Sequence, residues 1–293
     1  VVPIKVFSIS FGPIFNITWD LKVSDSKVKA KRVLFFDSGV GGLSVYKAVK
    51  ALNPDVEAYY LFDNECFPYG NKGDHFLIKR IEALLEKASK IFDLSAIVVA
   101  CNTASTVALP ELRLNIKLPI VGVVPAVKPA AKLSKNKIIG LLATPGCLSR
   151  EYTNNLIKTF ASDCKVIKVG DAHLAEIAED RLSTGVVDKA GIEKIIKPFT
   201  SLSKDERPDT IVLGCTHYPF VKDVLEELLP EVRYVDSGEA IGRRVKDVVK
   251  EAKYIETERI QNKAFYTGVL KNYTDREKMV KEFGFVSLEK FEL

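Results

Sequence analysis

The sequence predicts an α/β fold of two similar, pseudo-twofold-related domains with mostly parallel sheets and the functional site in the cleft between them. From Arg32 onward, short apolar runs alternate with amphipathic helical stretches. The runs are continuously apolar, which is typical of parallel strands covered by helices on both faces. The second half of the chain also repeats the strand ends of the first half, and this repeat predicts two similar domains.

Eight strands are predicted, because each run is short, apolar or β-branched, and bounded by turn-forming residues. They are VLFF (33–36), AYYLF (58–62), AIVVA (96–100), IVGVV (120–124), KIIGLLA (137–143), KVIKV (165–169), TIVLG (210–214) and RYVD (233–236). Helices are expected between them, for example from Asp74 to Ile91 and from Phe220 to Leu229.

Three strand ends in each half match one another. They are FFDSG (35–39), IVVACNTAS (97–105) and IVGVVPA (120–126), then LLATPG (141–146), IVLGCTHYP (211–219) and RYVDSGEA (233–240). The alternative is that any two strand–helix units look alike in sequence. The repeat favours a first domain of residues 32–124 with 235–293, and a second domain of residues 125–234.

Residues 1–31 are assigned to an N-terminal extension that lies outside both cores. Their apolar stretch is interrupted by proline, lysine and glycine, and it is too short to span a bilayer. It also lacks the cleavage site of a secretory leader. No association with a membrane is therefore expected.

Composition and cysteine usage narrow the class of protein further. The net charge is +5, and the basic residues are scattered, which argues against a nucleic-acid-binding protein. The five cysteines are Cys66, Cys101, Cys147, Cys164 and Cys215. Their odd number and irregular spacing argue against a disulfide framework, and the absence of a C-x-x-C pair argues against structural zinc. Reduced thiols in the cytoplasm fit this pattern.

The loop DSGVGGLS (37–44) follows the first predicted strand and contains Gly39, Gly41 and Gly42. Glycines let backbone N–H groups approach an anion at the start of a helix. The loop does not match the dinucleotide-binding fingerprint, because the third glycine of that pattern would fall at Ser44.

Cys101 and Cys215 each follow a predicted strand, in ACNTAS (100–105) and GCTHYP (214–219). A helix N-terminus lowers the pKa of a cysteine, and a nearby histidine such as His217 can polarise a thiol. The residues after Cys101 (Asn102, Thr103 and Ser105) could cap the helix or hold a ligand oxygen. The alternative is that Cys101 is a small buried residue beside an ordinary helix cap.

Two thiols at matched strand ends favour an enzyme that inverts a stereocentre. One base removes a proton from one face of a carbon, and the conjugate acid of the other delivers a proton to the opposite face. The reverse reaction exchanges these roles, so two similar groups suit the reaction. An ordinary thiol has a pKa of about 8.5, close enough to neutrality for both roles.

Seven blocks of this chain resemble those of the glutamate racemase family in order and approximate spacing. They are FDSGVGGLSV (36–45), FPYG (67–70), VACNTAST (99–106), IVGVVPAVKPA (120–130), GLLAT (140–144), LGCTHYP (213–219) and VDSGEAI (235–241). The resemblance runs from about Arg32 to Leu293. It implies racemisation of glutamate for peptidoglycan biosynthesis, with neither a cofactor nor a metal.

The resemblance also implies roles for particular residues. Cys101 would act on D-glutamate and Cys215 on L-glutamate, assisted by Asp37 and His217 respectively. The substrate would be held by Asp37, Ser38, Tyr69, Gly70, Asn102, Thr103, Thr144, Thr216 and His217. The segment DAHLAEIAED (171–180) resembles the enteric Gram-negative members of the family, and it places Glu179 or its neighbour Glu176 in an acidic catalytic position.

The same subgroup suggests a peptidoglycan precursor as an activator and a homodimer as a candidate assembly, and the sequence identifies residues for neither. Cys147 is either a third thiol near the site or a passive small residue. The alternative functions are an aspartate racemase, a thiol hydrolase or amidase that uses Cys215, His217 and an acidic residue, and a non-catalytic amino-acid-binding module.

Overall fold

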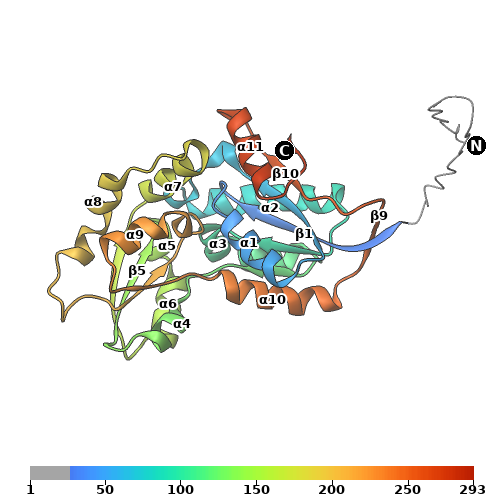
Figure 1. Cartoon of the computed structure of the whole chain (residues 1–293). Coiled ribbons are helices and arrows are strands. Elements are labelled where there is room, and N and C mark those ends of the chain that lie inside the picture. The colour runs from blue at the N-terminus through green and yellow to red at the C-terminus, as the bar shows by residue number, and fades with distance from the viewer. Residues whose placement is uncertain (1–26) are drawn as a thin grey trace, which may run out of the picture.

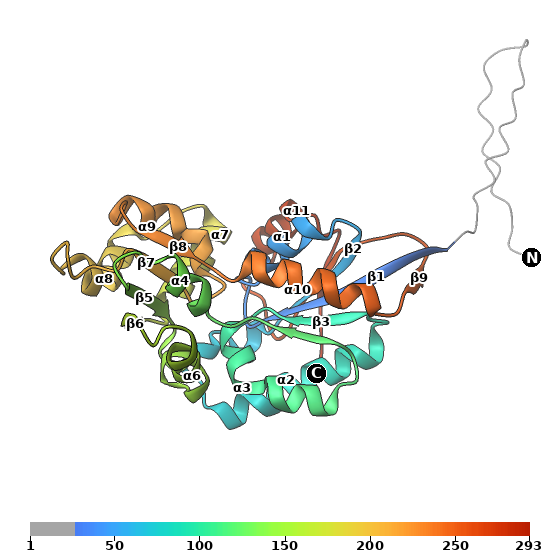
Figure 2. The same ribbon diagram turned by 90° about the horizontal axis from the view of Figure 1, so that it is seen from below.

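The computed structural model describes residues 27–293, and its strands form two sheets (Figures 1 and 2). The larger sheet contains β1 (Val28–Asp37), β2 (Val56–Phe62), β3 (Ala96–Val99), β4 (Ile120–Gly122), β9 (Ile255–Thr257), β10 (Lys263–Tyr266) and β11 (Leu288–Lys290). The smaller sheet contains β5 (Ile138–Ala143), β6 (Lys165–Gly170), β7 (Thr210–Leu213) and β8 (Arg233–Val235). All eight strands predicted from the sequence are present, and β9, β10 and β11 were not predicted.

The two sheets share one strand order. The larger sheet has the order β11-β10-β2-β1-β3-β4, with β9 paired to β1, and the smaller sheet has the order β6-β5-β7-β8. The segment β2-β1-β3-β4 therefore corresponds strand for strand to β6-β5-β7-β8. Neighbours in both segments pair in parallel. The predicted class, two similar α/β halves with mostly parallel sheets, is confirmed.

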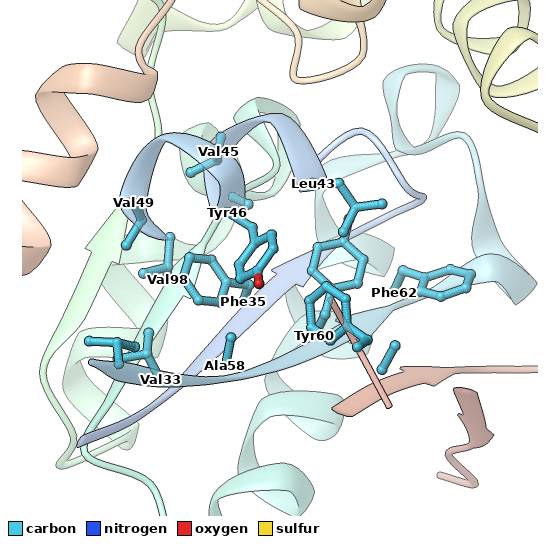
Figure 3. Close-up of a cluster of buried hydrophobic side chains, with 14 of the residues drawn as sticks. Val33, Phe35, Leu43, Val45, Tyr46, Val49, Ala58, Tyr60, Phe62 and Val98 are labelled. Atoms are coloured by element: carbon cyan, nitrogen blue, oxygen red, sulfur yellow. The ribbon is translucent and has the colours of Figure 1, made fainter. Parts of the chain in front are cut away.

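Both faces of the larger sheet are covered by helices, as its apolar strands require. On one face, Phe35 and Tyr60 pack with residues of α1 (Leu43–Leu52), among them Tyr46 (Figure 3), and α10 (Gly238–Glu251) joins the same cluster. On the other face, Leu34 packs with residues of α2 (Asp74–Ile91) and α3 (Asn102–Asn115). Successive residues of β1 thus fill two separate cores, which is the alternation expected of a central strand.

The smaller sheet is covered in the same way. The helices that pack on one face are α7 (His173–Thr184), α8 (Lys189–Thr200) and α9 (Lys222–Leu228). Those on the other face are α4 (Val127–Leu133), α5 (Pro145–Ser149) and α6 (Glu151–Phe160). Because the strands of the two matched segments are parallel, the loops that follow them gather at one edge, where the polar strand ends of the sequence lie.

Some boundaries differ from those predicted. The first strand begins at Val28 instead of Val33, and Ala30 in it is buried and paired with Ile255. Part of the segment assigned to the N-terminal extension therefore belongs to β1, because β9 provides a partner that the local sequence does not reveal. Residues 1–26 lie outside the described residues.

The helix predicted from Asp74 is present with the expected bounds, whereas the one predicted from Phe220 begins at Lys222 after a 3₁₀ turn. The bounds of the two domains stay a prediction. Within residues 27–293, no helix combines the length and apolar character needed to cross a bilayer.

Candidate active site

Cys101 lies between β3 and α3 and caps that helix with its own side chain. Its Sγ accepts a hydrogen bond from the Ala104 N–H at 3.4 Å, so the cap expected from Asn102, Thr103 or Ser105 is provided by the cysteine itself. The Ser38 hydroxyl lies 3.8 Å from the same sulfur. Burial, followed by the charges of Asp37 and Cys215, raises the pKa of Cys101. A helix N-terminus by itself would lower the pKa of Cys101, but burial has the larger effect and raises it. Cys101 is therefore a neutral thiol at pH 7.

Asp37 ends β1 and is completely buried between the two halves of the molecule. Its Oδ1 accepts hydrogen bonds from the Ser38 hydroxyl at 3.2 Å and the Gly39 N–H at 3.0 Å. Its Oδ2 accepts one from the Thr216 hydroxyl at 2.9 Å. Asp37 therefore reaches Cys101 through Ser38. Burial raises the pKa of Asp37, and the nearby His217 opposes that effect.

Cys215 follows β7 and is partly exposed, and His217 contacts it directly. The His217 Nδ1 lies 3.6 Å from the Cys215 Sγ, and the Nε2 lies 3.0 Å from the Glu179 Oε1. Burial lowers the pKa of His217, but its contacts with Cys215 and Glu179 prevail and raise it to about 10. Burial raises the pKa of Glu179, but His217 and Arg276 prevail and hold it at about 2.

These shifts make His217 and Glu179 a buried ion pair at neutral pH. The Gly41 N–H also points at the His217 Nε2, at 3.1 Å. The Nε2 cannot both donate to Glu179 and accept from Gly41. Because the imidazolium carries a proton on each ring nitrogen, Nε2 donates to Glu179. The Nδ1–H is then free to donate to the Cys215 sulfur, which stabilises negative charge there.

The neighbouring acidic residue does not share this position. Glu176 is exposed and pairs with His173 at 2.9 Å. Of the two glutamates in the segment 171–180, the structure brings Glu179 to His217.

The glycine loop was expected to bind an external anion, and two of its N–H groups instead bind carboxylates of the protein itself. The Gly39 N–H donates to Asp37, and the Val40 N–H donates to the Glu179 Oε1 at 2.7 Å. A Cβ on Gly39 would overlap the Glu179 carboxylate, and one on Gly41 would lie 2.6 Å from carbons of the His217 ring. The glycines are thus required because the two halves approach closely here.

We expect Gly41→Ala to reduce catalytic activity by about a hundredfold, since the added methyl group displaces the His217 ring from Cys215 and a shift of about 1 Å can have that effect. Gly73→Ala is the matched control, because nothing lies within 4 Å of a Cβ at that exposed glycine. Steady-state kinetics and thermal unfolding of both variants provide the measurement. Full activity of Gly41→Ala would contradict the close approach described here.

Several predicted substrate-binding residues contact one another across the two halves of the molecule. The Thr103 and Thr144 hydroxyls are 3.3 Å apart and come from opposite halves, and a Cβ on Gly70 would contact the Thr144 side chain. Asn102 is buried, and its Nδ2 has no hydrogen-bond partner among residues 27–293. A buried amide without a partner suits a ligand oxygen.

The Tyr69 hydroxyl has a partner within the protein, and a role for Tyr69 in substrate binding stays a prediction. Its ring is buried in the same hydrophobic cluster as Cys101, and its hydroxyl donates to the Asp63 Oδ2 at 2.7 Å. Asp63 also pairs with Arg80 at 2.7 Å. Asp63 therefore holds the Tyr69 hydroxyl, and the ring packs in the cluster that contains Cys101.

Cys147 has the surroundings of a passive residue. It is fully buried, its N–H donates to the Thr144 hydroxyl, and its sulfur lies 3.7 Å from the Thr153 hydroxyl. Burial raises its pKa to about 11.

Some residues near the two thiols and their partners were not predicted from the sequence. A small pocket beside Cys215 is lined by Asn102 and Thr216, and also by Ser44, Asp236 and Ser237. Asp236 and Ser237 belong to the matched strand end VDSGEA (235–240), so the repeat in the sequence could have indicated them. Arg276, whose Nη2 lies 2.7 Å from the Glu179 Oε2, had no signal in the sequence.

Known proteins with similar sequences are racemases. A family model described as Asp/Glu/Hydantoin racemase matches residues 42–245. The chain is 43% identical over 278 residues to the glutamate racemase of Photorhabdus laumondii, covering 94% of each chain. It is 44% identical over 258 residues to that of Yersinia enterocolitica, covering 88% of this chain and 89% of the other.

A solved structure agrees with the sequence comparison. The crystal structure of Escherichia coli glutamate racemase in complex with L-glutamate and the activator UDP-MurNAc-Ala is similar with a TM-score of 0.85 and 42% identity, covering 89% of this chain and 98% of that one. The similarity thus extends over both sheets and over the residues that surround the thiols. The chain belongs to the Asp/Glu/hydantoin racemase family and, within it, to the glutamate racemases.

Proposed function

We propose that this protein interconverts L- and D-glutamate without a cofactor and that Cys101 and Cys215 are its two bases. The observation that carries this proposal is the position of the two thiols at matched ends of β3 and β7, each with its own hydrogen-bond partners. A hydrolase with Cys215, His217 and Glu179 as its catalytic groups would leave Cys101 without a function. Membership of the racemase family also favours racemisation over that alternative.

In the direction from L- to D-glutamate, the Cys215 thiolate takes the α-proton from one face of Cα. The Cys101 thiol delivers its proton to the other face and becomes the thiolate, so charge and protons balance. The protonation described above suits this direction, because Cys101 is a neutral thiol and the His217 imidazolium donates to Cys215. The reverse reaction starts from the opposite protonation of the two sulfurs.

Neutral donors would hold the carboxylates of the substrate, and neutral acceptors its ammonium group. The Asn102 amide and the hydroxyls of Ser38, Thr103, Thr144 and Thr216 would hold the carboxylates and the ammonium group of glutamate, with Gly70 leaving room beside Thr144. Hydrogen bonds to Asp37 hold the Ser38 and Thr216 hydroxyls, and the Thr103 and Thr144 hydroxyls contact each other. Such fixed groups would keep the reacting carbon between the two sulfurs.

The wider function follows from the relatives. D-Glutamate made by this enzyme would supply peptidoglycan biosynthesis in the cytoplasm. A nucleotide-linked peptidoglycan precursor is the proposed activator, because the similar Escherichia coli structure contains UDP-MurNAc-Ala as an activator. A homodimer is the proposed assembly, and nucleic acid and membrane are not proposed as partners.

Proton NMR in D₂O tests the reaction directly. Purified protein incubated with L-glutamate, with neither pyridoxal phosphate nor metal added, should produce D-glutamate that carries deuterium at Cα, and the reverse reaction should do the same. Incorporation into the product enantiomer is expected because a separate base on the opposite face delivers a solvent-derived proton. No exchange and no racemisation with either enantiomer would overturn the proposed function.

A further inference from the structure

Arg276 connects the larger half of the molecule to the catalytic groups around Cys215. It lies in α11 (Tyr273–Glu282), which follows β10 and packs against α7 of the smaller half (Figures 1 and 2). Its Nη2 forms an ion pair with the Glu179 Oε2 at 2.7 Å. The side chains are 14% and 8% exposed, respectively, so this pair is largely removed from solvent.

From Glu179 the contacts continue to the sulfur. The Glu179 Oε1 lies 3.0 Å from the His217 Nε2, and the His217 Nδ1 lies 3.6 Å from the Cys215 Sγ. Arg276, Glu179, His217 and Cys215 therefore form one continuous row, in which the Glu179 carboxylate lies between the Arg276 guanidinium and the His217 imidazolium. The two oxygens of Glu179 have different partners, because Oε1 faces His217 and the Val40 N–H while Oε2 faces Arg276.

We propose that Arg276 is a positioning residue that fixes Glu179, and through it the His217 imidazolium, against Cys215. Arg276 contacts neither sulfur, so it acts only through Glu179. This inference rests on the proposed function and assigns Arg276 to the half of the reaction that Cys215 performs.

The physical reason is the cost of a buried charge without a partner. A carboxylate that loses its cation in such a site either takes up a proton or rotates toward solvent. The other titratable groups near the pair, Asp37 and Tyr60, cannot replace a cation, since one is acidic and the other is a hydroxyl that donates to the Gly39 carbonyl. Without Arg276, Glu179 would hold the imidazolium less firmly, and the donor to the Cys215 sulfur would be lost.

Racemisation alone cannot test this assignment. The equilibrium constant between enantiomers is one, so kcat/KM must be equal in the two directions for every variant. A one-base reaction separates the two thiols. With a glutamate that carries chloride on its β-carbon, a thiolate takes the α-proton, a Cα–Cβ double bond forms and chloride leaves. The resulting enamine tautomerises and hydrolyses in water to 2-oxoglutarate and ammonium.

We expect Arg276→Ala to lower the rate of elimination from the L-enantiomer by about tenfold or more, and to change the rate from the D-enantiomer by less than about threefold. Arg276→Lys should recover most of the L-specific rate, since it restores the cation. The control is Lys278→Ala, because Lys278 is exposed on the same helix and should leave both rates unchanged.

The possible results separate the inference about Arg276 from the proposed function. An equal decrease for both enantiomers would show that Arg276 only holds the two halves together, and no decrease for either would show that it is dispensable; both results overturn the inference. If Arg276→Ala fails to fold, Arg276→Gln gives the same decision, because it removes the cation that pairs with Glu179 and keeps most of the side chain, and the D-specific rate is the internal measure of folded enzyme. A wild-type protein that does not racemise glutamate would instead overturn the proposed function.

Discussion

Replacing either Cys101 or Cys215 with serine should abolish racemisation. Each turnover requires one thiolate and one thiol on opposite faces of Cα, and a serine hydroxyl is a far weaker acid and base at neutral pH. The loss of one general acid–base group reduces a rate by about 10²–10⁴-fold. The measurement is the circular dichroism of glutamate over time for each variant.

Cys164→Ser is the matched control for these variants. Cys164 is partly exposed beside Asp163, at the end of the smaller sheet opposite the site, and its replacement should leave activity unchanged. Substantial activity in Cys101→Ser or in Cys215→Ser would mean that the missing thiol is not an obligatory base.

The second expected result is that the two variants differ in elimination from β-chloroglutamate. Cys101→Ser should still process the L-enantiomer through Cys215, and Cys215→Ser should still process the D-enantiomer through Cys101. In each variant the other enantiomer should react at least about 10²-fold more slowly, since its base is missing. Release of chloride from each enantiomer provides the measurement.

The structure gives each thiol the independence that this result requires. Cys215 is served by His217 and Glu179, whereas Cys101 is served by Ser38 and the N-terminus of α3. Equal loss of both eliminations in both variants would show that the thiols act as one unit, and the assignment of faces would then be wrong.

Local patterns predicted most of the fold. The eight central strands were predicted because continuous apolar runs bounded by turn residues can be recognised within a few residues of sequence. Strands β9, β10 and β11 were missed because they lie outside the repeated strand ends and depend on distant partners. Residues of β10 pair with β2 about two hundred positions earlier, and no local periodicity reports such a pairing.

The two thiols could be recognised from local sequence, because the repeat of strand ends and the parallel topology place both at the edge where ligands bind. The groups that surround the thiols depend on tertiary contacts. The packing of the two halves places Glu179 against His217 and Arg276 against Glu179, pairs the Tyr69 hydroxyl with Asp63, and raises the pKa of Cys101 by burial. Charge pairing and desolvation depend on contacts between residues far apart in the chain, and those contacts exist only once the two halves have packed together.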